Sequence, residues 1–280
     1  MKITLNAYAK VNITLDVLRR RPDGYHELRS IMHAVSLHDT VTLEPAPSVC
    51  VTCGIYLPPN NTARRAAELF EAHTGHAARI HIEKRIPSQA GLGGASADAA
   101  AVLRGLCHIY GGVTEPALFD MARQVGADVP FCLLGGCALA EGIGERLTPL
   151  PPAALNLLLV KGEQGVSTAA LFGGLRLPLA HPNTGQALAA LQAGELHALC
   201  AAAQNALEPA ACALVPNIAT YKKKLLQHGA LAAAMTGSGS CVAGIFQSGE
   251  EAERARAAFA AAPFAAVCQT GAFRPEPIEE

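Results

Sequence analysis

The chain has 280 residues, half of them hydrophobic, so it can bury a substantial core and is too apolar for a disordered protein. Its 22 lysines and arginines nearly balance its 23 acidic residues, and the formal net charge is −1. This balance argues against nucleic acid and anionic membranes as partners, and any bound anion must be held by local geometry. No apolar run is long enough to span a membrane without a charged or turn residue, so we expect a cytoplasmic protein.

The nine cysteines are scattered without a repeating spacing. Cys50 and Cys53 form a lone C-x-x-C motif, with no second pair at the spacing of zinc ligands. We therefore expect reduced and mostly buried thiols, and we assign no metal ligand to them.

The N-terminal residues 2–18 alternate between apolar and polar side chains and predict one or two strands. Because a strand begins at once, we expect no signal or transit peptide. Lys10 and Asn12 are two residues apart, so they point to the same face of the strand. Lys10 could be an ordinary solvated lysine, but its small apolar neighbours Ala9 and Val11 favour a functional role.

A tight turn is expected next, because Arg19–Gly24 contains the sequence Pro-Asp-Gly. Tyr25 and His26 follow directly. From the residues alone they are two half-exposed aromatic side chains at the end of a hairpin. Further strands are expected through residues 41–43 and at 50–53.

A glycine-rich loop lies between an alternating strand at residues 78–84 and an apolar helix. Gly91, Gly93 and Gly94 permit backbone angles closed to other residues and carry no side chain to hold a ligand away. Ser96 is expected to cap the helix that follows. Free N–H groups and the positive dipole end of that helix would form a site for a phosphate group.

Common phosphate-loop patterns do not match this loop. No lysine follows the glycines as in the Walker motif, no acid stands about 20 residues beyond them as in dinucleotide-binding folds, and the protein-kinase signatures are missing. The alternative is a close-packed turn whose glycines serve only the packing of helix against sheet.

Two helices are expected on either side of the loop in the sequence, at residues 61–73 and 114–124. Asp128 follows in the sequence Gly-Ala-Asp-Val-Pro. It could form an Asx turn or a helix cap before Pro130, or it could be a catalytic carboxylate. Lys10 and a phosphate loop in the same chain favour the catalytic role.

A proline-rich segment at residues 147–153 is predicted to separate two domains, residues 1–153 and 154–280. The second domain should have the order β-α-β-β-α-β of a ferredoxin-like plait, which makes the fold class α+β. Its expected elements are strands at 155–160, 231–236, 241–247 and 264–269 and helices near 184–203, 218–228 and 250–262.

Together the motifs resemble those of the GHMP kinases, a family that phosphorylates small molecules such as galactose, homoserine and mevalonate. The resemblance rests on Pro87-x-x-x-Gly91-Leu-Gly-Gly-x-Ser96, Gly126-Ala-Asp-Val-Pro130 and Met235-Thr-Gly-Ser-Gly-Ser240. Ala7–Leu15 and Pro22-Asp-Gly-Tyr-His26 make the chain most similar to the branch that acts on a cytidylated methylerythritol. The family often has two serines after the glycines, and here Ala97 occupies the second place.

The resemblance implies the two-domain fold of this family, ATP as phosphoryl donor and Mg²⁺ as its counter-ion. Lys10 and Asp128 would be catalytic, with Asp128 taking the hydroxyl proton and Lys10 beside it. ATP would be bound by Pro87, Ser88, Gln89, Ala90, Gly91, Leu92, Gly93, Gly94, Ala95 and Ser96. The acceptor would be bound by Asn12, Tyr25, His26, Ser167, Thr168, Phe172, Gly237, Ser238 and Gly239. No protein ligand to the metal is assigned, and Asp98 must either face away from the phosphates or meet the metal.

The expected reaction is phosphorylation of the 2-hydroxyl of a cytidine-diphosphate-linked methylerythritol in non-mevalonate isoprenoid synthesis, by a monomer or loose homodimer. One alternative is another kinase of the family, acting on homoserine, mevalonate or a sugar. That alternative does not explain why Tyr25 and His26 directly follow Pro-Asp-Gly. The other is a non-catalytic nucleotide-binding regulator, which loss of Lys10 or Asp128 would favour, but both are present.

Overall fold

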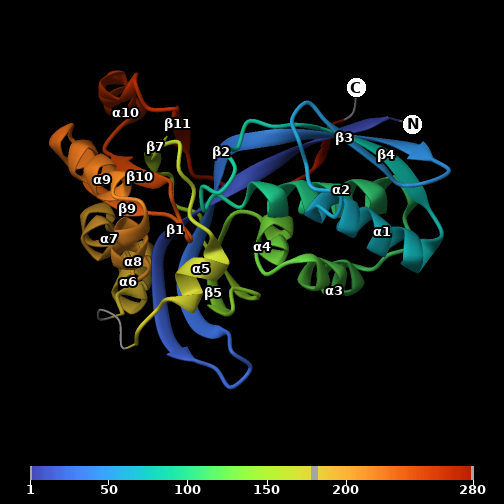
Figure 1. Cartoon of the computed structure of the whole chain (residues 1–280), viewed down its shortest axis with the longest axis horizontal. Coiled ribbons are helices and arrows are strands. Elements are labelled where there is room, and N and C mark those ends of the chain that lie inside the picture. The colour runs from blue at the N-terminus through green and yellow to red at the C-terminus, as the bar shows by residue number, and fades with distance from the viewer. Residues whose placement is uncertain (1, 178–181, 279–280) are drawn as a thin grey trace.

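Two β-sheets organise the chain, which the computed structural model describes over residues 2–177 and 182–278 (Figure 1). Strands β1 (Ile3–Arg20) and β2 (His26–Ala46) form a long antiparallel pair at the centre of the first sheet. The sheet continues in the order β12-β1-β2-β4-β3, with β5 also beside β2, β6 beside β5 and β8 beside β1. The bounds of these strands are Cys50–Cys53 (β3), Ala77–Glu83 (β4), Cys137–Gly142 (β5), Arg146–Leu150 (β6), Gln204–Asn205 (β8) and Pro277–Ile278 (β12).

Helices α1 to α4 lie on one side of the first sheet (Figure 1). Helix α2 packs directly on the β1–β2 pair, and a β-carbon at Gly105 would lie 2.7 Å from the side chain of Leu43. Only glycine permits so close an approach. Alternate residues of β1, such as Leu5 and Ala7, are buried in this layer, as the period of two requires. The helices are Thr62–Thr74 (α1), Gly94–Tyr110 (α2), Glu115–Val125 (α3) and Val129–Leu134 (α4).

The second sheet is antiparallel and has the strand order β11-β7-β10-β9. Its strands are Asn156–Lys161 (β7), Ala232–Met235 (β9), Val242–Phe246 (β10) and Phe264–Gln269 (β11). Helices α9 (Asn217–Gln227) and α10 (Gly249–Arg256) pack on it. This arrangement is the predicted ferredoxin-like plait, and the α+β fold class is confirmed.

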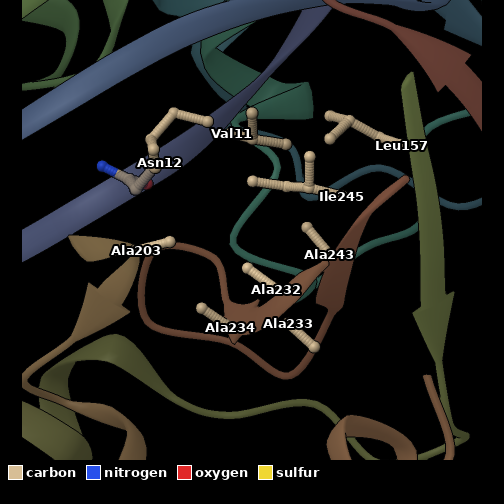
Figure 2. Close-up of a pocket in the computed structure, with 10 residues that line it drawn as sticks. Val11, Asn12, Leu157, Ala203, Ala232, Ala233, Ala234, Ala243 and Ile245 are labelled. Atoms are coloured by element: carbon tan, nitrogen blue, oxygen red, sulfur yellow. The ribbon is translucent and has the colours of Figure 1, made fainter. Parts of the chain in front are cut away.

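The two sheets pack against each other through apolar side chains. Along β7, Leu157 and Leu159 belong to the core shared with the first sheet, while Leu158 and Val160 face the core of the second. Figure 2 shows the small cavity between the sheets, lined by Val11 from the first sheet and by Leu157, Ile245 and the alanines of β9 from the second. Its volume of about 10 Å³ is at the lower limit for one water molecule, so it is no ligand site.

The helices differ from the prediction in three ways. The helix expected near 184–203 is two helices, α6 (Thr184–Ala193) and α7 (Leu196–Ala202), because Gly194 adopts a left-handed conformation with φ +70°. Helices α5 (Thr168–Gly173) and α8 (Glu208–Leu214) were not predicted, since each is too short to show a clear periodicity. The helix expected at 250–262 ends early and continues as the 3₁₀ turn Ala257–Phe259.

The predicted cap at Ser96 is wrong. Helix α2 begins at Gly94, its N-cap is Gly93 with φ +71°, and Ser96 lies within the first turn. A glycine at the N-cap supplies no side-chain acceptor, so the first N–H groups of the helix are left for a ligand.

The predicted domain boundary at residue 153 lies just before β7. Strands β8 and β12, both from the second part of the chain, nevertheless pair with β1. The two parts are therefore joined by backbone hydrogen bonds, and the division stays a prediction. No helix among the described residues is both long and apolar enough to cross a membrane.

Candidate active site

A cleft of about 830 Å³ lies at the N-terminal end of α2, and most of the predicted site residues line it. Both glycine-rich loops contribute to its wall, together with the middle of β1 and the loop before α4. The predicted residues that line it are Lys10, Asn12, all ten residues of Pro87–Ser96, Asp128, Ser167, Thr168, Phe172, Gly237, Ser238 and Gly239. Tyr25 and His26 lie outside this lining.

The phosphate loop is shaped by contacts with β1. The backbone N–H of Lys10 donates to the carbonyl oxygen of Leu92 at 3.0 Å. A β-carbon at Gly93 would lie 3.0 Å from the Lys10 side chain, and Gly93 is in the left-handed region at φ +71°. A glycine is needed here for both reasons. The loop therefore holds the N-terminus of α2 next to Lys10.

Lys10 and Asp128 meet in the cleft. The Nζ atom of Lys10 lies 3.7 Å from Oδ2 of Asp128 and donates to Oδ1 of Asn12 at 2.8 Å. The Lys10 side chain is only 4% exposed, whereas that of Asp128 is 37% exposed. Asp128 precedes α4, but its side chain makes no capping hydrogen bond. The ammonium group is thus fixed, and the carboxylate is free to face a substrate.

The second glycine-rich loop, residues 236–240, packs against the first. The Asn12 N–H donates to Oγ1 of Thr236 at 2.9 Å, and the Ser240 N–H donates to the Gln89 carbonyl oxygen at 3.2 Å. A β-carbon at Gly91 would overlap the Thr236 carbonyl oxygen. A side chain at position 91 would therefore collide with the second glycine-rich loop, so glycine is required there for packing as well as to leave room for a ligand.

Only some of the residues predicted to bind the phosphoryl acceptor lie together in the structure. Tyr25 is 60% exposed at the tip of the β1–β2 hairpin. His26 is buried, and its ring lies 5.3 Å from the ring of Phe172, which does line the cleft. Burial, and then the charge of Arg20, lowers the pKa of His26. Ser167 caps α5, and Thr168 bonds to Ser238 across the cleft, with 2.7 Å between Oγ1 and Oγ.

Comparison with known proteins agrees with this geometry. The models of the GHMP kinases N terminal domain and of the GHMP kinases C terminal match residues 61–136 and 187–266. A 4-diphosphocytidyl-2-C-methyl-D-erythritol kinase of Desulfitobacterium hafniense is 45% identical over 262 residues, 90% of each chain. The corresponding kinase of Pelotomaculum thermopropionicum is 44% identical over 273 residues, 92% of this chain and 94% of that one.

The chain belongs to the GHMP kinase family. A crystal structure of 4-(cytidine 5′-diphospho)-2C-methyl-D-erythritol kinase superposes with a TM-score of 0.84 at 36% identity, covering 96% of this chain and 99% of that one. Homoserine kinase from Cytophaga hutchinsonii superposes with a TM-score of 0.79 at 23% identity, covering 99% of this chain and 97% of that one, which shows a shared fold.

At the phosphate end of this cleft the structure shows a buried charged network that the sequence did not predict. The Nζ atom of Lys84 lies between the carboxylates of Asp39 and Asp98, 2.7 Å from Oδ2 of Asp98. Asp39 also accepts the N–H groups of Arg85 and Ile86, which begin the phosphate loop. The network thus joins β2, the end of β4 and the first turn of α2. It brings together residues distant in sequence, so no local pattern could reveal it.

Asp98 faces the cleft rather than away from it. Burial raises the pKa of Asp98 to about 7, while the charge of Lys84 opposes this rise and that of Asp39 adds to it. Its Oδ1 atom is buried and has no hydrogen-bond partner among the described residues.

The donors at the phosphate end can be compared with the needs of Mg²⁺. Carboxylate oxygens such as those of Asp98 and Asp128 suit this ion. No group of three or more His, Cys, Asp or Glu residues that could hold a metal occurs in the part of the chain that the structure describes. This donor set fits an ion carried mainly by the phosphates of a nucleotide.

A further wall of the cleft was missed by the sequence analysis. Residues 55–58, between β3 and α1, line it, and Ile55 and Tyr56 are 53% and 84% exposed. The Thr62 hydroxyl, at the start of α1, donates to the Ala95 carbonyl oxygen at 2.6 Å and so joins this wall to the phosphate loop. Exposed apolar side chains in a loop are common, so the sequence does not single them out, and only the fold places them beside the cleft.

Proposed function

We propose that the chain transfers the γ-phosphoryl group of ATP to the 2-hydroxyl of 4-diphosphocytidyl-2-C-methyl-D-erythritol, in the non-mevalonate pathway to isoprenoids. The observation that carries this proposal is the Lys10–Asp128 pair at the mouth of a phosphate loop, in a chain whose relatives with that name match about 90% of its length. The predicted cytoplasmic location and the monomer or loose homodimer remain predictions.

The nucleotide is expected to lie along α2 and the wall formed by residues 55–58. The unpaired N–H groups at the start of α2 and its positive dipole end favour the phosphates. Tyr56 and Ile55 offer an exposed apolar surface on which an adenine ring can stack. The glycines of the loop let the backbone approach the phosphates closely.

Asp128 is the proposed base. Its exposed carboxylate can accept the hydroxyl proton as the bond to phosphorus forms. Lys10, whose side chain is buried and held by Asn12, stabilises the negative charge of this carboxylate and of the attacking oxygen. A carboxylate is too weak a base to ionise an alcohol beforehand, so positioning and electrostatics supply most of the rate.

Mg²⁺, when bound with ATP, supplies positive charge that neutralises the transferring phosphoryl group. Asp98 and Asp128 are the carboxylates of the cleft that could contribute oxygen ligands to it. The Asp39–Lys84–Asp98 network then holds the first turn of α2 in place beneath the phosphates.

The cytidine of the acceptor is assigned to Tyr25, His26 and Phe172. The His26 and Phe172 rings already lie close together, whereas Tyr25 is exposed and must turn toward the cleft to stack on the base. Gly237, Ser238 and Gly239 would contact the part of the acceptor between cytidine and hydroxyl.

The assignment can be tested by coupled ADP release with Mg-ATP and four acceptors: the cytidylated methylerythritol, homoserine, mevalonate and galactose. We expect turnover with the cytidylated acceptor alone. Turnover with another acceptor would keep the kinase and reject the roles of Tyr25 and His26. Binding of ATP without turnover of any acceptor would contradict the proposed function as a whole.

A further inference from the structure

The turn at residues 236–240 is held from behind by a side chain that no motif predicted. Asn205, in β8, is 6% exposed. Its Nδ2 donates to the carbonyl oxygens of Met235 and Gly237, both at 2.8 Å. Its Oδ1 accepts the N–H of Leu207 at 2.9 Å. Both amide hydrogens are therefore used to hold the turn.

Glu208 fixes the same turn from the start of α8. One oxygen of its carboxylate accepts the Met235 N–H at 2.8 Å, and the other pairs with Lys222. Asn205 and Glu208 thus hold three backbone groups of the turn, at Met235 and Gly237. Neither side chain lies near Lys10 or Asp128 in sequence, but the turn they hold contacts Asn12 and Gln89.

These bonds decide where the next N–H groups point, because C=O and N–H face opposite ways in a trans peptide. With the Met235 carbonyl on Asn205, the Thr236 N–H points the other way and donates to the Cys241 carbonyl oxygen at 3.0 Å. With the Gly237 carbonyl on Asn205, the Ser238 N–H must likewise point away from Asn205. Ser238 lines the cleft, and its N–H has no acceptor in the described parts of the chain.

The position of Ser238 indicates which ligand this N–H meets. Its hydroxyl bonds to Thr168, at the start of the helix that carries Phe172, so it lies on the acceptor side of the cleft. The glycines on either side have φ values of +54° and +85°. Backbone N–H groups in such turns form concave sites for anionic oxygens. The acceptor of the proposed reaction carries a diphosphate.

We propose that the Ser238 N–H binds an oxygen of the acceptor's diphosphate, and that Asn205 is the positioning residue that aims it. This inference rests on the proposed function, because it takes the acceptor to be a cytidine diphosphate derivative. Asn205 touches no substrate itself and acts only through the direction of the Gly237–Ser238 peptide.

The test compares CDP with cytidine as ligands of the wild-type protein and of Asn205→Asp. Aspartate keeps the size and the acceptor for Leu207 but turns the donor into a negative charge facing two carbonyl oxygens. We expect the dissociation constant of CDP to rise about 10- to 100-fold, as for the loss of a hydrogen bond to a charged group. Those of cytidine and ATP should change less than about twofold, because neither ligand is expected to use the Ser238 N–H.

Thr184→Val is the matched control. Thr184 is also fully buried and hydrogen-bonded, with 2.8 Å between its Oγ1 and that of Thr14, but it holds neither glycine-rich loop. It should lower the melting temperature and leave the ratio of CDP to cytidine affinity unchanged. Equal losses of CDP and cytidine affinity in Asn205→Asp would show a general structural role and overturn the inference.

A second measurement needs no variant. In wild-type protein labelled with ¹⁵N-serine, the Ser238 amide signal, assigned by its loss in Ser238→Ala, should move when CDP is added and stay in place with cytidine. A signal indifferent to CDP would overturn the inference even if the proposed function holds. If wild-type protein binds neither CDP nor cytidine, the proposed function fails, and the inference fails with it.

Discussion

The two ends of the cleft differ in how many of their side chains are already held in place. At the reacting end, the Lys10 ammonium is almost fully buried and bonded to Asn12, and both glycine-rich loops pack around it. At the end proposed to bind the nucleoside, where Phe172 lines the cleft, Tyr25 is mostly exposed and the His26 ring lies against that of Phe172. Under the proposed function, the reacting groups are therefore preorganised, whereas recognition of the base requires a side chain to become ordered.

This difference follows from where each group lies in the fold. Lys10 is in the middle of β1 between two core-facing neighbours, so its side chain has one place to go. Tyr25 lies in a turn beyond the end of the sheet and is mostly exposed. Ordering such a side chain on binding costs about 0.5–1.5 kcal/mol. The reacting end should therefore tolerate substitution far less than the nucleoside end.

The largest effect is expected for Asp128→Asn, which keeps the shape of the base and removes its charge. The catalytic constant should fall about 100- to 10,000-fold, as for loss of a general base. The dissociation constant of ATP should change little, because the N-terminus of α2 is unaltered. Coupled ADP release and equilibrium dialysis measure the two quantities, and a variant retaining most of its turnover would remove Asp128 from the mechanism.

An intermediate effect is expected for Gly91→Ala. The added methyl would overlap the Thr236 carbonyl oxygen, and φ is +73°, so both glycine-rich loops must shift. Gly75→Ala is the matched control, because Gly75 is also left-handed, with φ +77°, but its β-carbon would meet nothing within 4 Å. We expect a similar backbone strain of about 1–2 kcal/mol in both variants.

The two variants should nevertheless differ in activity, because only the substitution at Gly91 disturbs the packing of the two glycine-rich loops. Only Gly91→Ala should lose about 100-fold in kcat/KM, because only there does the reacting end move. Thermal unfolding and steady-state kinetics separate the two variants. Equal kinetics would mean that the contact between the loops does not matter for the reaction.

The smallest effect is expected for Tyr25→Ala. The KM for the acceptor should rise about tenfold through loss of one stacking contact, with kcat and the KM for ATP nearly unchanged. The melting temperature should also stay constant, since the ring is mostly exposed in the free protein. Leu18→Ala, on the same hairpin and 46% exposed, controls for general effects on the hairpin. A large loss of kcat in Tyr25→Ala would place the ring at the reacting end instead.

Much of the fold could be predicted because its signals are local. The alternation at residues 78–84 and the helical pattern at residues 61–73 define elements from neighbouring residues, and both elements appear in the structure close to the expected bounds. Ser96 was misassigned as a cap because a serine before a helical run is the usual signal, whereas here a left-handed glycine begins the helix.

The site could be predicted only where a motif is contiguous. The phosphate loop and the neighbours of Lys10 and Asp128 are such motifs, and family resemblance supplied their roles. The Asp39–Lys84–Asp98 network joins residues 14 and 45 positions apart, and Asn205 bonds to residues 30 and 32 positions away. Only the folded chain brings them together, so composition and spacing carry no trace of them.

The most direct test is a crystal structure with Mg²⁺, a non-hydrolysable ATP analogue and 4-diphosphocytidyl-2-C-methyl-D-erythritol. The mechanism predicts that the 2-hydroxyl lies within about 3 Å of the Asp128 carboxylate, in line with the terminal phosphate. It also predicts that Lys10 keeps its contact with Asn12 while the Tyr25 ring has turned onto the cytosine. A different hydroxyl at Asp128, or cytidine bound away from the hairpin, would contradict the proposed reaction.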